Sequence, residues 1–251
     1  MKSNRETEIL YGIHPVFEAV QSGRRRIFEL FMAEGRDSQR NDALLSLALE
    51  KKIPVRTISP GEIRSLSQSD KHQNVAARVS PYPYAPLDLE GRDSQTKPTL
   101  FLILDQIQDP QNLGAILRTA LCAGANHVIV PKDRSAGATP AVSRASAGAL
   151  EHIRLSLVTN LVNTIKEMKE NDLWVFGLDR DGRTPVYGMD LTVPTALVIG
   201  GEGKGIRPLI KKACDELIFI PQVALFNSLN ASAAGAVVLY EAFRQRNNPG
   251  L

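Results

Sequence analysis

The chain has 251 residues, of which 43% are hydrophobic and 23% charged, and its formal net charge is +3. These values are typical of a globular protein and allow one large domain or two smaller ones. No segment reaches the roughly 18 uncharged apolar residues of a membrane-spanning helix, so we expect a cytoplasmic protein with no membrane partner. Two cysteines and four scattered histidines exclude a disulfide framework and a cysteine-rich metal site, so no metal is expected.

The first third of the chain predicts a small α/β domain, which we place at residues 1–80. Its β-rich segments are residues 27–33 and 53–59, and its helical segments are residues 40–52 and 61–68. Residues 1–80 also carry the whole excess of positive charge, including three consecutive arginines, Arg24, Arg25 and Arg26. Such a cluster suits RNA phosphates, but a solvated turn before a strand explains it equally well.

Residues 81–98 predict a linker between two domains. The stretch from Ser80 to Pro98 holds four prolines and many polar residues without apolar periodicity. Because proline fixes the backbone torsion angle φ and disfavours regular structure, we expect this segment to be partly extended.

Residues 99–251 predict a second domain with a parallel sheet. The expected strands are apolar runs separated by helical segments, at residues 99–107, 127–131, 173–179, 195–201 and 216–221. Unbroken apolar strands indicate a sheet that helices cover on both faces.

A glycine-rich loop follows the strand at residues 195–201, in the sequence "LVIGGEGKGIRP" from Leu197 to Pro208. It fails the phosphate-binding pattern G-x-x-x-x-G-K-[ST] and also the dinucleotide pattern G-x-G-x-x-G. This failure disfavours a nucleotide-dependent oxidoreductase or an NTPase. The glycines indicate either tight backbone geometry or close approach of a ligand to the main chain at the carboxyl end of a strand, where open α/β sheets bind ligands. An ordinary strand-to-helix turn explains them equally well.

Two further turns lie at strand ends. In "DPQNLGAILRTA", Asp109 and Pro110 predict a helix start with Asn112 in its first turn. In "NSLNASAAG", Ser228 or Asn230 can cap a helix that is rich in small residues. Three such turns after strands of one parallel sheet can meet in a single cleft.

Taken together, the three stretches resemble the motifs of the SpoU family of RNA ribose 2′-O-methyltransferases, in the SPOUT superfamily. The motifs are "DPQNLGAILRTA", "LVIGGEGKGI", and "IP" followed by "NSLNASAAG". The segments "YGIHPVFEAV" and "KHQNVAARV" resemble the ends of the small substrate-binding domain typical of the family's ribosomal RNA guanosine methyltransferases. The resemblance implies a SPOUT domain with a trefoil knot, S-adenosylmethionine (SAM) as methyl donor, RNA as substrate and a homodimer with sites at the subunit interface.

The resemblance also implies roles for individual residues. It places main-chain contacts to SAM at Gly200, Ile220 and Leu229, and polar active-site positions at Asn112, Arg118, Glu202, Ser228 and Asn230. Because a guanidinium stays protonated up to a pKa above about 12, we expect Arg118 to position the substrate and stabilise charge. The third motif departs from the family at Gln222, Ala224 and Phe226, and this departure affects the expected SAM pocket.

The most favoured substrate is a guanosine in large-subunit ribosomal RNA. One alternative is 2′-O-methylation of transfer RNA, which the small N-terminal domain disfavours. Another is a non-catalytic RNA-binding factor of ribosome assembly, which the joint presence of the polar positions disfavours.

Overall fold

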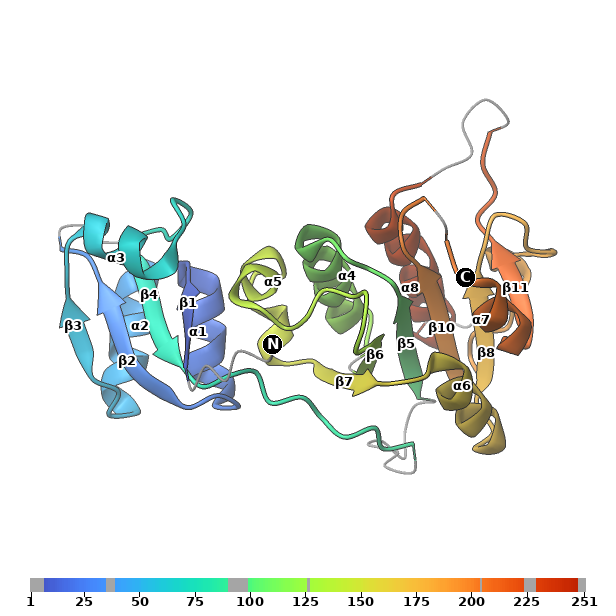
Figure 1. The fold of residues 1–251 in the computed structure, drawn as a ribbon, viewed down its shortest axis with the longest axis horizontal. Coiled ribbons are helices and arrows are strands. Elements are labelled where there is room, and N and C mark those ends of the chain that lie inside the picture. Colours follow the sequence, from blue (N-terminus) through green and yellow to red (C-terminus); the bar gives the residue numbers. More distant parts are fainter. Residues whose placement is uncertain are drawn as a thin grey trace. The chain divides into compact units, whose positions relative to one another are not determined.

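In a computed structural model the chain divides into two units (Figure 1). The structure describes residues 7–34, 39–89, 99–125, 127–203, 205–223 and 229–247. The first unit comprises Met1–Pro83 together with Ala138–His152, and the second comprises Tyr84–Gly137 together with Ile153–Leu251. Each unit has its own sheet and its own core.

The first unit is built on a mixed four-stranded sheet. Its elements in chain order are β1 (Glu8–Tyr11), α1 (Ile13–Ser22), β2 (Ile27–Met32), α2 (Gln39–Glu50), β3 (Val55–Thr57), α3 (Pro60–Ser67) and β4 (Val75–Val79). The strand order is β1-β4-β2-β3, with β4 antiparallel to both neighbours and β3 parallel to β2. Helices α1 and α2 cover one face through a core that includes Leu30 and Leu44, and α3 covers part of the other through Ile63. The predicted strands and helices of this region are confirmed, whereas β1 and β4 were not predicted.

A later segment of the chain also belongs to the first unit. Helix α5 (Pro140–Ala145) and the 3₁₀ helix η1 (Ala149–Glu151) pack on α1, and α5 also packs on β1. The boundaries expected from the sequence place these residues in the second domain. The apolar residues of this segment predict that it is buried, but they do not show which of the two cores it joins.

The second unit is built on a seven-stranded parallel sheet. Its strands are β5 (Leu100–Asp105), β6 (His127–Pro131), β7 (Arg154–Val158), β8 (Trp174–Leu178), β9 (Thr184–Pro185), β10 (Thr195–Gly200) and β11 (Glu216–Phe219). Their order is β7-β6-β5-β10-β8-β11-β9, and every pairing is parallel. The five predicted strands and the α/β class are confirmed; β7 and the short β9 were not predicted.

Helices lie on both faces of this sheet (Figure 1). They are α4 (Pro110–Cys122), α6 (Leu161–Glu170), α7 (Pro208–Ala213) and α8 (Ala231–Asn247), with the 3₁₀ helix η2 (Val186–Gly188). Helices α6 and α7 enclose a core with β5 and β10, whereas α4 and α8 pack against each other, and Gly235 of α8 meets Ile199 of β10. All six residues of β5 are buried, as expected for a strand covered on both faces.

Part of the predicted linker packs on the second unit. Ala85 N–H donates to the carbonyl of Leu155 at 3.0 Å, and Leu89 joins the core beneath α6. The remaining linker residues, 90–98, lie outside the described residues. Within the described ranges, no helix is long and apolar enough to span a membrane.

Candidate active site

The candidate site lies at the carboxyl edge of the parallel sheet, where β5, β10 and β8 are neighbours. Each of these strands is followed by a loop, and because the strands are parallel the loops leave the sheet at the same edge. The loop after β5 leads into α4, which begins as predicted: the Asp109 side chain accepts from Gln111 N–H at 3.0 Å, and Pro110 is the first helical residue. This start places Asn112 in the first turn of α4.

Three of the predicted polar residues meet in one hydrogen-bonded cluster, Asn112, Glu202 and Asn230. The Asn112 side-chain amide donates to the Glu202 carboxylate at 2.8 Å, and the Asn230 amide donates to the Asn112 side-chain oxygen at 3.0 Å and also to Glu202. They come from three separate segments, and Asn112 and Asn230 are 118 positions apart. The three turns therefore meet at one place, as the sequence predicted.

Asn230 also caps α8. Its side-chain oxygen accepts from Ser232 N–H at 2.9 Å and Ala233 N–H at 3.3 Å, so it satisfies main-chain donors that a helix start leaves unpaired. This cap fixes the Asn230 side chain while its amide group reaches Glu202. The cap predicted for Ser228 or Asn230 is thus supplied by Asn230, and Ser228 lies outside the described residues.

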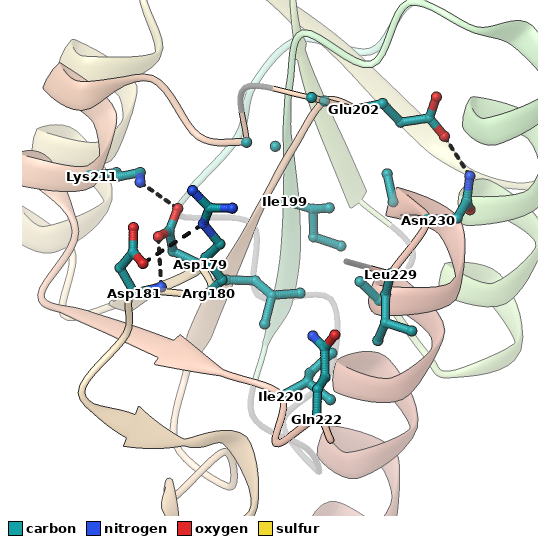
Figure 2. A pocket seen from close by; sticks show the side chains of 17 residues that line it. Asp179, Arg180, Asp181, Ile199, Glu202, Lys211, Ile220, Gln222, Leu229 and Asn230 are labelled. Carbon is teal, nitrogen blue, oxygen red and sulfur yellow. Dashed lines mark hydrogen bonds and ion pairs between the residues drawn. The ribbon is translucent and has the colours of Figure 1, made fainter. Parts of the chain in front are cut away.

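Beside this cluster is a cavity of about 400 Å³ (Figure 2). Its lining includes Gly200, Ile220 and Leu229, the positions predicted to hold a cofactor, as well as Glu202 and Asn230. Apolar or small lining residues include Leu178, Ile199, Ala231 and Ala234. A concave site of this size that combines apolar surface with several polar groups is suited to a small polar molecule.

The glycine loop forms one wall of the cavity by close contact between main-chain segments. A Cβ atom on Gly200 would lie 2.1 Å from the Gly205 carbonyl carbon, and one on Gly201 would lie 2.4 Å from the Gln106 oxygen. Gly203 and Gly205 adopt φ values of 84° and 61°, which L-residues with side chains rarely adopt. The first of the two expectations, tight backbone geometry, is confirmed, because the close neighbours of these glycines are the chain's own backbone atoms.

A charged wall of the cavity was not predicted from the sequence. Asp179, at the carboxyl end of β8, is buried and binds Lys211 at 2.6 Å, and its carboxylate also accepts from Asp181 N–H at 3.1 Å. Figure 2 shows this group opposite Glu202 and Asn230. The predicted end of the strand at Asp179 was the available signal, because a third parallel strand must also deliver its loop to this edge.

Arg118 stands apart from the cavity within one chain. It lies on α4, is exposed, and is not among the residues that line the cavity. Of the three departures in the third motif, Gln222 lines the cavity, and Ala224 and Phe226 lie outside the described residues. In the described ranges no group of three or more His, Cys, Asp or Glu side chains could hold a metal ion.

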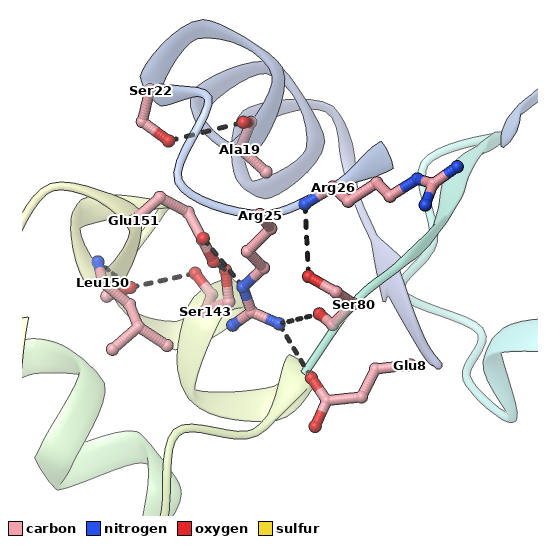
Figure 3. Close-up of polar contacts among 10 residues, drawn as sticks. Glu8, Ala19, Ser22, Arg25, Arg26, Ser80, Ser143, Leu150 and Glu151 are labelled. Carbon is pink, nitrogen blue, oxygen red and sulfur yellow. Dashed lines mark hydrogen bonds and ion pairs between the residues drawn. The ribbon is translucent and has the colours of Figure 1, made fainter. Parts of the chain in front are cut away.

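The three arginines of the first unit differ sharply in exposure, and Figure 3 shows Arg25 with its carboxylate partners Glu8 and Glu151. Arg25 is 2% exposed and binds Glu151 at 2.9 Å and Glu8 at 2.7 Å, while its guanidinium lies 5.1 Å from the centre of the Tyr82 ring. Burial raises the pKa of the Glu151 carboxyl, and Arg25 opposes that rise. The predicted phosphate contact by Arg25 is therefore corrected: this guanidinium is used inside the unit. Arg26 is exposed and Arg24 half-buried.

Comparisons with known proteins agree with this geometry. The model of the SpoU rRNA Methylase family matches residues 99–240, and a model described as RNA 2′-O ribose methyltransferase substrate binding matches residues 9–85. The two family models together span most of the chain: the methylase model covers most of the second unit and also the segment Ala138–His152 of the first unit.

Individual relatives match over nearly their full length. A 23S rRNA (guanosine-2′-O-)-methyltransferase from Pseudomonas putida, RlmB, is 42% identical over 96% of this chain and 98% of its own. The Bacillus subtilis protein YacO, whose name places it in the TrmH family of tRNA/rRNA methyltransferases, is 39% identical over 98% and 99%. A solved structure also matches: the crystal structure of the SpoU methyltransferase AviRb from Streptomyces viridochromogenes, in complex with the cofactor AdoMet. Its sequence is 26% identical, the TM-score is 0.81, and the match covers 97% of this chain and 94% of AviRb.

Proposed function

Because the chain belongs to the SpoU rRNA methylase family, we propose that it methylates the ribose 2′-hydroxyl of a guanosine in large-subunit ribosomal RNA, with SAM as methyl donor. The observation that carries this proposal is the cluster of Asn112, Glu202 and Asn230 at a cavity lined by Gly200, Ile220 and Leu229. These residues are far apart in the sequence, and a shared ligand site explains why all of them meet at one edge of the sheet.

The residues present fit SAM. Ile199, Ile220 and Leu229 give the cavity apolar surface for an adenosine, and the glycine loop offers main-chain groups without side chains in the way. Glu202 puts a negative charge at the cavity wall, which favours a positively charged sulfonium. When bound, SAM supplies a methyl group on that sulfonium to an oxygen nucleophile.

The hydrogen bonds of the cluster distinguish the two asparagines. Both hydrogens of the Asn230 amide are used, by Glu202 and Asn112, and its oxygen caps α8. The Asn112 amide gives one hydrogen to Glu202 and, within the described part of the chain, keeps its second for another acceptor. We therefore assign Asn230 to holding Glu202 in place and Asn112 to contacting the ribose.

Arg118 is the proposed group for the developing charge on the 2′-oxygen. Its guanidinium stays positive at all working pH values, so it aligns the ribose and stabilises negative charge without removing the proton itself. Holding the two reacting groups in line accounts for much of the rate gain in such a displacement. We assign Ser228, which lies outside the described residues, to orienting the ribose or Arg118.

We also propose a homodimer, a trefoil knot in the second unit and action in the cytoplasm, as the family resemblance implies. The separation of Arg118 from the cavity in one chain is in keeping with a site that two subunits share. On α8, Tyr240 and Phe243 leave 51% and 37% of their surfaces exposed, and exposed aromatic side chains of this kind suit a subunit interface.

Ribosomal RNA is favoured over transfer RNA by two features. The substrate-binding model matches the first unit, and the relative with 42% identity carries the ribosomal activity in its name. A non-catalytic binding factor would not need the polar cluster beside the cavity.

The test is methyl transfer from labelled SAM to undermodified ribosomal and transfer RNA from a strain that lacks this protein, followed by mapping of the methylated nucleotide. We expect label on one guanosine of the large-subunit RNA, and a loss of about 100-fold or more in Arg118→Ala with SAM affinity unchanged. Label on transfer RNA would overturn the substrate, and firm SAM binding without transfer to either RNA would favour the non-catalytic role.

A further inference from the structure

An ion pair between a buried carboxylate and a partly exposed guanidinium closes the base of the glycine loop. Asp105, the last residue of β5, is 0% exposed. One of its carboxylate oxygens accepts from Arg207 N–H at 2.9 Å, and the other accepts from Arg207 Nε at 2.8 Å and binds the second nitrogen of the guanidinium at 2.8 Å. The side chain of Arg207 is 43% exposed on its outer side.

Both ends of the loop are attached to this one residue. The Asp105 carbonyl accepts from Gly201 N–H at 2.8 Å, just after β10, while its carboxylate holds Arg207, just before α7. Between these ends Gly205 N–H donates to the Gly201 carbonyl at 3.1 Å, and Ile206 is buried in the core. Asp105 thus sets the distance between the two points where the loop leaves and re-enters the fold.

The loop is closely packed at its base, so a change in that distance would displace it. Gly200 and Gly201 already touch neighbouring main chain too closely for a Cβ atom. Glu202 lies within the loop and must reach Asn112 and Asn230. A small shift at the base would therefore move both a cavity wall and a member of the polar cluster.

Stability alone does not explain this pair. Because the Arg207 side chain is 43% exposed, the desolvation cost falls mainly on the Asp105 carboxylate, and an apolar side chain of similar size often stabilises a fold as well or better. What the ion pair adds is direction: two guanidinium nitrogens bind one carboxylate oxygen and the Arg207 main-chain N–H binds the other, so these contacts orient both residues.

We propose that Asp105 and Arg207 are positioning residues, which shape the SAM-binding wall by holding the Gly200–Gly205 loop at its base. The inference rests on the proposed function for its ligand. Neither residue lines the cavity, so both act through the loop.

The second unit offers a matched control in Asp215. Its carboxylate also accepts one main-chain N–H, from Val175 at 2.9 Å, and binds one cation, Lys169, at 2.7 Å. Val175 lies near the amino end of β8, and Asp215 directly precedes β11, so this pair lies at the opposite edge of the sheet from the cavity. Lys169→Gln thus removes a similar ion pair away from the loop.

The experiment compares Arg207→Gln with Lys169→Gln by SAM titration calorimetry and by hydrogen exchange of the Gly201 and Gly205 amides, which are hydrogen-bonded within the loop and at its base, without ligand. We expect Arg207→Gln to weaken SAM binding by about 10-fold to 100-fold and to speed exchange of both amides. Lys169→Gln should change neither, and Arg207→Lys should restore part of the affinity because it returns a cation to Asp105.

Affinity within twofold of the wild type and unchanged exchange in Arg207→Gln would overturn the proposal. If Arg207→Gln does not fold, Arg207→Lys is compared with the wild type, because lysine keeps the charge but has one nitrogen in place of the two that bind Asp105. Unchanged SAM affinity and unchanged exchange in Arg207→Lys would then overturn the proposal. If the wild type bound no SAM, the proposed function would fall, and the exchange rates alone would decide whether Arg207 holds the loop.

Discussion

Two polar clusters in this molecule are both built around glutamate carboxylates and lie in opposite surroundings. Arg25 with Glu8 and Glu151 lies inside the first unit, whereas Asn112 with Glu202 and Asn230 lies at the cavity of the second. Both connect residues more than 100 positions apart. The difference in exposure separates their roles. A polar cluster stabilises the fold when it is buried, and it can contact a ligand when its groups face an open cavity.

The largest effect should follow from breaking the buried cluster. Arg25→Ala leaves the Glu151 carboxylate, whose side chain is 0% exposed, without its cation. We expect a loss of about 3–5 kcal/mol in the free energy of unfolding, measured by urea denaturation of the first unit. The matched control is Arg26→Ala, an exposed arginine next in sequence, which should cost less than about 1 kcal/mol. Equal midpoints for the two variants would contradict the assignment of Arg25 to the fold.

The buried side chain of His127 extends this comparison, because its contribution to stability depends on pH. Ser156 gives its hydroxyl hydrogen to the Ala85 carbonyl, so its oxygen accepts from His127, at 2.8 Å. Burial lowers the pKa of His127 to about 4, below the value of about 6.5 in an unfolded chain. The unfolded state therefore binds more protons between these values. Stability is complete above pH 6.5 and falls by up to about 3 kcal/mol as the pH drops to 4.

Unfolding free energies measured between pH 7 and pH 4 test this in His127→Gln, which keeps a donor for Ser156 and does not titrate. The variant should lose less stability on acidification than the wild type. His14→Gln, at an exposed histidine, should follow the wild type, and a parallel acid response in His127→Gln would show that other groups cause it.

The exposed cluster should respond in activity and not in stability. Asn112→Ala removes the amide that we assign to the ribose, whereas its hydrogen bond to Glu202 lies at an exposed position where water can replace it. We expect a fall of about 10-fold to 100-fold in kcat/KM for methyl transfer, with the free energy of unfolding changed by less than about 0.5 kcal/mol. Gln111→Ala, in the same helical turn, is the control and should keep near wild-type rates. A stability loss that matched the activity loss would make the cluster structural.

The smallest effect concerns the two arginines that remain accessible near the buried one. If Arg24 and Arg26 bind RNA phosphates, their joint replacement by Ala should reduce the slope of log affinity against log salt by about 0.7–0.9 for each phosphate that is no longer neutralised. SAM affinity should stay unchanged. Filter binding of ribosomal RNA across a salt series measures the slope, and a slope equal to that of the wild type would remove both residues from the RNA interface.

Much of the candidate site was predictable because its signals are local. Asp109 and Pro110 mark a helix start from four or five neighbouring residues, and the glycine loop follows an apolar run that can only be a buried strand. Once three strands are parallel, their loops leave from one edge, so the sequence pattern allows the three turns to meet; the family resemblance then names Asn112, Glu202 and Asn230 as polar positions of one site.

What the sequence could not contain is the choice of partner across long separations. Nothing near Arg25 distinguishes it from Arg24 and Arg26; its burial depends on Glu151, 126 positions later, in a segment that packs on the first unit. In the sequence Asp105 is likewise one residue of a predicted strand, and only the structure shows that it binds Arg207.

The sequence by itself therefore determined the parallel sheet, the turns at its carboxyl edge and the residue types available for chemistry, because backbone propensity and apolar periodicity act over a few neighbours. Only the tertiary structure decided which charged groups are buried in pairs and which face the cavity, because burial and pairing depend on packing between distant segments.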